Sequence, residues 1–343
     1  MTVYILIFFS ALLISLAGTP LLRRTALAMG FVDEPEPRKI HQSPIPLLGG
    51  LGIYLAFIAA LFLVRDMAEL PGYLGQLLGI LGGATACALL GLWDDRYGLN
   101  PLIKLLVEAL ATAMLVWSGI RVEFLHQPVL NLAVTYLWVI GITNALNFVD
   151  NMDGLAGSVA SVAAAFFFLL ATTSGQYLVA SMSAALLGAC LGFLRYNFYR
   201  ATIFMGDAGS LFLGFMLAAL GIKLRFENTD IVTWMIPVMV LGLPIFDTTL
   251  VTLSRLRRRV PIYQGSTDHL SHRLVALGFT KREAVFALSL AAMAFGLGSL
   301  FLLKASILEG YFTGTVVAVA CLAALVWLER RWIGPPPDQE NRR

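Results

Sequence analysis

Carboxylates in separate polar segments are the residues of this chain best suited to chemistry. Asp94 and Asp95 are adjacent within residues 91–98, and Asp207 stands between glycines within residues 204–210. Because glycine lets backbone approach a ligand and helix N-termini attract phosphate, Asp207 suits a magnesium ion beside a diphosphate. The Asp94–Asp95 pair suits a metal or a proton relay. A solvated turn stays open for that pair, as does a plain helix cap for Asp207.

A third polar segment covers residues 144–157. If its latter half is helical, Asn147, Asp150 and Asn151 share one face, which could bind a nucleotide or a hydrated cation. Asp153 precedes Gly154 and an apolar run, a pattern equally typical of a helix N-cap. The segment therefore predicts either a second part of the binding site or, for Asp153, a structural role.

Histidines and basic residues supply the complementary charge. His269 and His272 lie at i and i+3, so on a helix they share a face with donors for a diphosphate, and Arg273 follows directly. A zinc pair lacks a third ligand at metal spacing. Lys104 could reach the membrane interface or bind phosphate, and the arginines at 257–259 are explained by attraction to anionic lipid headgroups.

These side chains must be positioned by membrane helices. The chain has 343 residues, of which 58% are hydrophobic and only 13% charged, which excludes an ordinary soluble protein. We expect a single transmembrane domain at 1–332 and a disordered tail at 333–343. Apolar runs of near-spanning length predict eleven helices, near 3–22, 47–64, 73–92, 101–118, 128–146, 154–173, 176–194, 209–223, 231–253, 284–303 and 310–328.

The connecting segments predict the orientation of this bundle. Nineteen lysines and arginines fall in the C-terminal tail and the segments after odd-numbered helices, against five on the other side. Under the positive-inside rule the C-terminus is cytoplasmic and the N-terminus lies outside. All the polar segments described above fall on the cytoplasmic side. We therefore expect an all-α integral membrane protein of the inner membrane, with about eleven spans and a site facing the cytoplasm.

Four segments, in order, resemble the signature of the polyprenyl-phosphate N-acetylhexosamine-1-phosphate transferases. They are RKIHQSPIPLLGG, LWDDRYGLNPLIK, NFVDNMDGLAG and FMGDAGS, and a histidine segment, DHLSHRL, follows them. With the helix pattern, the resemblance covers nearly the whole chain. The chain is more similar to the bacterial N-acetylglucosamine branch than to the muramoyl-pentapeptide branch, because an arginine-rich stretch precedes the histidine segment, which lacks three consecutive histidines.

The resemblance implies a role for each matching residue. Asp207 matches the carboxylate that binds Mg²⁺, with Mn²⁺ as the alternative ion, and Asp150 is implied beside it. Asp94 and Asp95 match the acidic pair that handles the lipid phosphate. We also expect catalytic roles for Asp150, His269 and His272, and substrate contacts for Lys39, His41, Lys104, Asn147, Asn151, Asp153, Asn197 and Arg273. Ser271 and Asn151 depart from the pattern of one branch or another, which leaves the sugar open.

The implied reaction moves N-acetylglucosamine 1-phosphate from a UDP-sugar to undecaprenyl phosphate and releases UMP, which starts a cell-envelope polysaccharide. The implied partners are these two substrates, the membrane and, as one option, a second copy in a homodimer; no nucleic acid is expected. A muramoyl-pentapeptide transferase and a covalent aspartyl-phosphate route stay as alternatives. A secondary transporter would place its carboxylates at the bilayer midplane, and an intramembrane aspartyl protease would need glycine where Phe204 stands.

Overall fold

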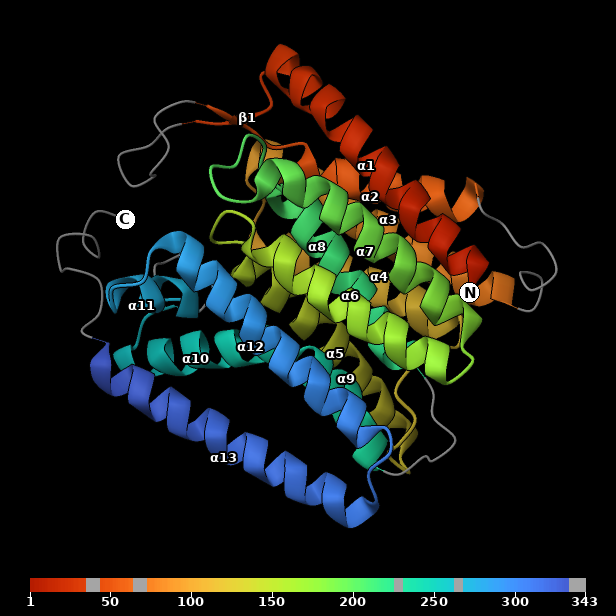
Figure 1. The fold of residues 1–343 in the computed structure, drawn as a ribbon, viewed down its shortest axis with the longest axis vertical. Coiled ribbons are helices and arrows are strands. Elements are labelled where there is room, and N and C mark those ends of the chain that lie inside the picture. Colours follow the sequence, from red (N-terminus) through yellow and green to blue (C-terminus); the bar gives the residue numbers. More distant parts are fainter. Residues whose placement is uncertain (35–43, 64–72, 225–230, 262–267, 333–343) are drawn as a thin grey trace.

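Long helices form almost all of the chain in the computed structural model, which describes residues 1–34, 44–63, 73–224, 231–261 and 268–332. Helices α1 to α7 are followed by the central helix α8 and then by α9 to α13 (Figure 1). The elements are α1 (Thr2–Met29), β1 (Val32–Asp33), β2 (Ile45–Pro46), α2 (Gly49–Leu63), α3 (Leu74–Tyr97), α4 (Pro101–Trp117), α5 (Pro128–Val149), α6 (Leu155–Thr173), α7 (Tyr177–Asn197), α8 (Gly206–Lys223), α9 (Ile231–Val240), α10 (Gly242–Arg258), α11 (Leu270–Ala276), α12 (Lys281–Leu302) and α13 (Ile307–Arg331).

Each of the predicted apolar runs contains a helix, so the all-α membrane architecture is confirmed. Within the described residues, eight helices are long and apolar enough to cross a membrane, and the bent pair α9–α10 would make nine. The predicted count of eleven is not confirmed, because α2 has 15 residues and α4 has 17. The first helix continues past its predicted end and stops at Gly30, whose φ of 60° forms a left-handed C-cap. The tail at 333–343 lies outside the described residues.

One predicted span is broken. Residues 231–253 were expected to form a continuous helix, but α9 and α10 meet at 73°. Pro237 lies inside α9 and has no N–H to donate to the preceding turn. At the break, Gly242 has no side chain where Phe295 of α12 packs, and a Cβ there would lie 2.5 Å from the phenylalanine ring. The bend directs α10 across the bundle (Figure 1), and Asp247 of α10 contacts His269 of the histidine segment.

Helix α8 is the core of the bundle. Every residue from Ala208 to Ile222 is buried, and α2, α3, α5, α6, α7 and α9 all contact this helix. Glycines allow the closest approaches: a Cβ on Gly91 of α3 would lie 2.3 Å from the backbone of Ala208, and one on Gly50 of α2 would lie 2.1 Å from Gly209. Because these contacts involve backbone atoms, the glycines fix how deeply α2 and α3 pack against α8.

The N-terminal hairpin and the start of α2 hold the segment that leads into α8. Strands β1 and β2 pair antiparallel, with Val32 opposite Pro46. The carbonyl of Pro46 accepts the backbone N–H of Phe204 at 2.8 Å, and the N–H groups of Gly49 and Gly50 donate to Phe204 and Met205. Backbone bonds therefore set the position of residues 204–205, one residue before α8 begins.

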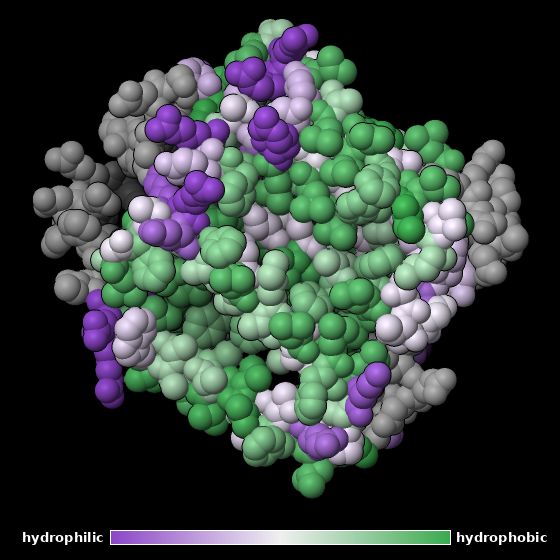
Figure 2. All heavy atoms as spheres, viewed as in Figure 1, coloured by the Kyte–Doolittle hydropathy of each residue, from purple (hydrophilic) through white to green (hydrophobic). Residues whose placement is uncertain are grey.

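The outer surface is largely apolar. In Figure 2 hydrophobic side chains cover the middle of the visible face, and hydrophilic ones gather near its edges. Helix α13 has few buried residues, with Leu308 80% exposed and Phe312 70% exposed. Such a surface has no counterpart on soluble monomers, where contiguous apolar patches are small. It is the surface expected where helices meet lipid tails.

Substituting Gly50 by alanine should destabilise the protein by about 1–3 kcal/mol, because the new methyl group would overlap the backbone of α8. The measurement is the thermal unfolding midpoint in detergent. Gly18→Ala is the matched control, since Gly18 lies inside α1 with no atom within 4 Å of its Cβ position. Equal midpoints for the two variants would show that the α2–α8 contact is not tightly packed.

Candidate functional site

Four helices bring their polar residues together at the N-terminus of α8. The Asp207 carboxylate accepts hydrogen bonds from Lys104 Nζ of α4 at 2.8 Å and from Asn147 Nδ2 of α5 at 2.9 Å. The Asn147 amide also donates to Ser210, one turn further along α8, at 2.9 Å. Residues that are up to 103 positions apart in the sequence thus meet around one carboxylate. The sequence analysis did not single out Ser210.

The Asp95 carboxylate binds backbone N–H groups in the first turn of α8. Its Oδ1 accepts the N–H of Asp207 at 2.8 Å, and its Oδ2 accepts the N–H of Ala208 at 3.2 Å. The N-terminus of a helix carries a partial positive charge and unpaired N–H groups, so a carboxylate there is doubly favoured. Gly206 has a φ of 67°, and a Cβ on it would lie 2.5 Å from the Asp95 carboxylate. Glycine is therefore required at position 206, both for its positive φ and for the space that the Asp95 carboxylate occupies.

Asp94 pairs with a different group from Asp95. Its carboxylate forms an ion pair with Lys104, and its Oδ1 accepts the backbone N–H of Leu99 at 2.6 Å. Lys104 therefore bridges Asp94 and Asp207, which lie on α3 and α8. The alternative of a solvated turn for the acidic pair is wrong, since both aspartates lie in the last turns of α3 and contact other helices. The cap alternative for Asp207 is also wrong, because Met205 occupies the N-cap.

A further carboxylate, which was not identified from the sequence, lies one turn after Lys104 on α4. Glu108 is 1% exposed, and its Oε2 accepts a hydrogen bond from Asn144 Nδ2 at 2.6 Å. This bond joins α4 to α5 next to the bond network of Asp207. The available signal was an ionisable residue inside an apolar run, which is costly in a membrane segment unless it has a partner.

Asp150 and Asn151 lie where α5 ends. The predicted helical face shared with Asn147 does not form, because α5 ends at Val149 and Asp150 is its C-cap. Burial, and then the negative charges of Asp207 and Asp153, raise the pKa of Asp150 to about 7. Asp150 therefore adjoins the Asp207 network electrostatically, although it shares no helix face with Asn147.

Asp153 and Asn197 hold the loop between α7 and α8. Asp153 accepts the backbone N–H of Ala201 at 3.0 Å, and the predicted N-cap role is wrong because Gly154, with φ of 75°, is the N-cap of α6. Asn197 is 3% exposed; its Oδ1 accepts the N–H of Gly154 and its Nδ2 donates to Ile203. In this structure, both side chains support the loop that leads into α8 and Asp207.

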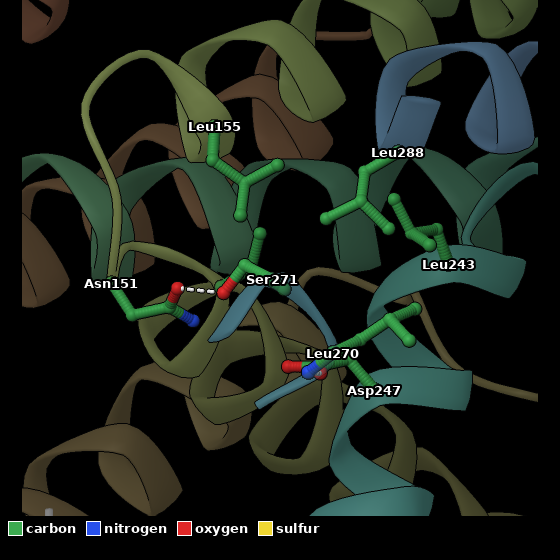
Figure 3. A pocket seen from close by; sticks show the side chains of 8 residues that line it. Asn151, Leu155, Leu243, Asp247, Leu270, Ser271 and Leu288 are labelled. Carbon is green, nitrogen blue, oxygen red and sulfur yellow. Dashed lines mark hydrogen bonds between the residues drawn. The ribbon is translucent and has the colours of Figure 1, made fainter. Parts of the chain in front are cut away.

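The histidine segment packs beside the end of α5. His269 Nδ1 lies 2.9 Å from a carboxylate oxygen of Asp247, a buried residue of α10, and the His269 ring centroid lies 6.0 Å from that of Phe148. The Ser271 hydroxyl donates to Asn151 Oδ1, as the dashed line in Figure 3 shows. Figure 3 also places Asp247 next to Leu270. Asp247 was not identified from the sequence, although it too is an acidic residue inside an apolar run.

The Arg273 side chain contacts Asp268 and the end of α13, although its backbone N–H donates to the carbonyl of His269. Its Nε donates to the backbone carbonyl of Asp268 at 2.7 Å, its Nη1 lies 2.7 Å from the Glu329 carboxylate of α13, and its guanidinium lies over the Trp332 ring. It is 1% exposed. Here Arg273 ties the histidine segment to the end of α13. Lys39 and His41, the two remaining predicted contacts, lie outside the described residues.

The donor set around Asp207 fits a magnesium ion that is completed by substrate. Among the described residues, no three histidine, cysteine, aspartate or glutamate side chains are grouped as a metal site of their own. Mg²⁺ is commonly held by one or two carboxylates together with water and substrate phosphates, so such a group is not needed. Asp207 and the nearby Asp150 offer hard oxygen ligands of this kind.

Comparisons with known proteins point to one family. The model of Glycosyl transferase family 4 matches residues 77–225, which contain most of α3, all of α4 to α8 and the whole Asp207 network. The chain is 34% identical over 309 residues to the probable undecaprenyl-phosphate N-acetylglucosaminyl 1-phosphate transferase of Bacillus subtilis, covering 88% of this chain and 85% of the relative.

Two further relatives also match most of the chain. The decaprenyl-phosphate N-acetylglucosaminephosphotransferase of Mycobacterium tuberculosis is 32% identical over 94% of this chain and 88% of the relative. The undecaprenyl-phosphate alpha-N-acetylglucosaminyl 1-phosphate transferase of Yersinia pestis is 28% identical over 82% of this chain and 79% of the relative.

Asp95→Ala should destabilise the protein by about 1–3 kcal/mol for each of the two backbone N–H groups that lose their acceptor. Asp95→Asn keeps one carbonyl acceptor and should fall between alanine and wild type. Thermal midpoints in detergent measure both. Glu123→Ala is the control, because its exposed ion pair with Arg121 is worth at most about 1 kcal/mol. A midpoint for Asp95→Ala as high as that of the control would rule out a capping role.

His272 should make the protein acid-sensitive. Burial and the nearby charge of His269 lower the pKa of His272 from 6.5 to about 4. Because the unfolded chain binds this proton more readily, stability is full above about pH 6.5 and falls as the pH drops towards 4. Between pH 7.5 and 5 the loss is about 2 kcal/mol. His272→Gln should reduce the shift in thermal midpoint over this range, whereas the exposed His126→Gln should leave it unchanged.

Proposed function

The chain belongs to Glycosyl transferase family 4, and we propose that it transfers N-acetylglucosamine 1-phosphate from UDP-N-acetylglucosamine to undecaprenyl phosphate, with release of UMP. Three relatives that match over most of their length are named as polyprenyl-phosphate N-acetylglucosamine-1-phosphate transferases. The lipid-linked sugar formed in this way is the starting unit of a cell-envelope polysaccharide.

The observation that carries this proposal is the meeting of Asp94, Lys104 and Asp207 at the N-terminus of α8. A transporter site would lie near the middle of the membrane, on discontinuous helices. Here the carboxylates lie at helix ends, where two substrates with phosphate groups can enter from water. A helix N-terminus with a cation beside it is a favourable place for phosphate.

The reaction joins two anions, so its barrier is largely electrostatic. An oxygen of the lipid phosphate attacks the phosphorus that carries the sugar, the bond to the bridging oxygen breaks, and UMP leaves. A phosphomonoester is mostly a dianion at pH 7, so little deprotonation is needed. Neutralising and orienting the phosphates should therefore contribute more than removing a proton.

Each residue of the network has a place in this scheme. Asp207, with Asp150 nearby, would hold Mg²⁺, which supplies charge neutralisation to the diphosphate when bound. Lys104, which pairs with Asp94 and Asp207, can also donate to a phosphate oxygen. Asp94 orients the lipid phosphate or takes its residual proton. Asp95 places the first turn of α8 through two backbone bonds.

The histidine segment completes the site on the side of the UDP-sugar. His269 lies near the end of α5, where Asn151 binds Ser271, and His272 follows within α11. We assign these histidines to the diphosphate or the nucleotide. Arg273 serves to hold the segment, because its guanidinium lies against Glu329. The distribution of lysine and arginine supports a site on the cytoplasmic side of the inner membrane.

Asp207→Asn should lower the rate of transfer by about 10²–10³-fold, the loss typical when one electrostatic contact to the reacting group is removed. Purified enzyme is mixed with UDP-N-acetylglucosamine and undecaprenyl phosphate, Mg²⁺ is titrated, and released UMP is measured. The exposed Glu123→Gln variant controls for the loss of an acidic residue elsewhere. Near-normal activity with unchanged Mg²⁺ dependence in Asp207→Asn would refute the metal role.

The preferred donor is measured in the same assay. UDP-N-acetylglucosamine, UDP-N-acetylgalactosamine and the muramoyl-pentapeptide nucleotide compete for one enzyme preparation, and the lipid product is identified. The proposal expects N-acetylglucosamine in the product. A muramoyl-pentapeptide product would assign the chain to the other branch. If no donor led to UMP release, the proposed reaction would be refuted.

A further inference from the structure

A buried aspartate on α10 holds the start of the histidine segment. One carboxylate oxygen of Asp247 accepts the backbone N–H of Leu270 at 2.7 Å, and the other lies 2.9 Å from His269 Nδ1. The two side chains are only 5% and 8% exposed. A buried carboxylate is costly unless its oxygens are hydrogen-bonded, and here each has a partner. Asp247 takes no direct part in the proposed transfer.

The chemistry of the pair fixes the histidine ring. An ionised carboxylate only accepts hydrogen bonds, so Nδ1 of His269 carries the hydrogen and donates it. Nε2 is then the one ring nitrogen of His269 left for another partner. Because the other oxygen of Asp247 accepts the Leu270 N–H, the carboxylate is fixed relative to the first turn of α11, and the ring can turn only by breaking its own bond to Asp247.

The position of this ring ties it to the proposed site. His269 packs near Phe148, two residues before Asp150, and the neighbouring Ser271 binds Asn151 at the same end of α5. Asp150 is close enough to Asp207 for the negative charge of Asp207 to raise its pKa. The segment that carries His269 is thus anchored from two sides, by α10 through Asp247 and by the α5–α6 turn through Asn151 (Figure 3).

We infer that Asp247 is a positioning residue, which holds His269 by Nδ1 so that Nε2 is presented to the diphosphate of the UDP-sugar. This inference rests on the proposed function, because it needs a substrate that His269 contacts. Carboxylates that orient a functional histidine through its other nitrogen commonly contribute about 10–100-fold to affinity or activity. A purely structural aspartate would contribute only to folding.

The discriminating variant is Asp247→Asn. Asparagine keeps a carbonyl oxygen for the Leu270 N–H but presents an NH₂ group to Nδ1, so the hydrogen of the ring must move to Nε2. We expect kcat/KM for UDP-N-acetylglucosamine to fall about 10–100-fold, with KM for undecaprenyl phosphate little changed. In a His269→Ala background, Asp247→Asn should cause almost no further loss, because its effect passes through the missing ring.

A spectroscopic measurement tests the same geometry without activity. The chain has four histidines, so ¹⁵N labelling of histidine gives few signals, and a His269→Gln variant assigns the one of interest. In the wild type, the His269 ring should carry its hydrogen on Nδ1. In Asp247→Asn, the ring should carry it on Nε2. Thr135→Val is the stability control. Thr135 is a buried residue of α5 that accepts the N–H of Val122 in the α4–α5 loop, far from Asp247 and His269 in the sequence.

The outcomes separate the two proposals. A wild-type enzyme that releases no UMP refutes the proposed function. In an active enzyme, additive losses from Asp247→Asn and His269→Ala would overturn the role of Asp247 alone. A wild-type His269 that is protonated on Nε2 and not on Nδ1 would overturn it as well, whether or not the Asp247 variants fold.

Discussion

The site depends on the two bonds that the Asp95 carboxylate accepts from the N–H groups of Asp207 and Ala208, in the first turn of α8. They join the end of α3 to the start of the most buried helix and fix the residue that follows Gly206. Asp207 then projects from a helix turn whose backbone is already satisfied, towards Lys104 and Asn147. Without an acceptor at this end, two N–H groups would be left unpaired at a cost of about 1–3 kcal/mol each.

The site has two parts that reach the same place from different halves of the chain. The first is rigid: α2, α3 and α5 pack on α8 through glycines that leave no room for a Cβ atom. The second is the short helix α11, which follows the bent pair α9–α10 and depends on side-chain bonds. Asn151 and Ser271 connect the two parts. The difference suits a reaction in which one substrate is a lipid held by the membrane and the other arrives from water.

The sequence predicted the helices well, because near-spanning apolar runs leave few alternatives in a membrane. It also predicted that Asp94 and Asp207 would belong to one site, since their segments fall on the same predicted side of the membrane. The position of Lys104 between them was not predicted, because its role was left open. Local geometry was harder. The bend between α9 and α10, the turn at Asp150 and the N-cap at Gly154 depend on neighbours distant in the sequence. Asp247 and Glu108 were missed because each is a lone acid whose partner, His269 or Asn144, belongs to another helix.

The complete burial of α8 has a consequence for how the enzyme responds to its lipid environment. A helix that faces lipid adjusts its tilt when the bilayer becomes thinner or thicker, at a cost of a fraction of a kcal/mol per ångström of mismatch. From Ala208 to Ile222, α8 presents no side chain to lipid, so its depth is set by protein neighbours alone. Variation in acyl-chain length therefore acts first on peripheral helices such as α13, and the carboxylate at the head of α8 is insulated from it.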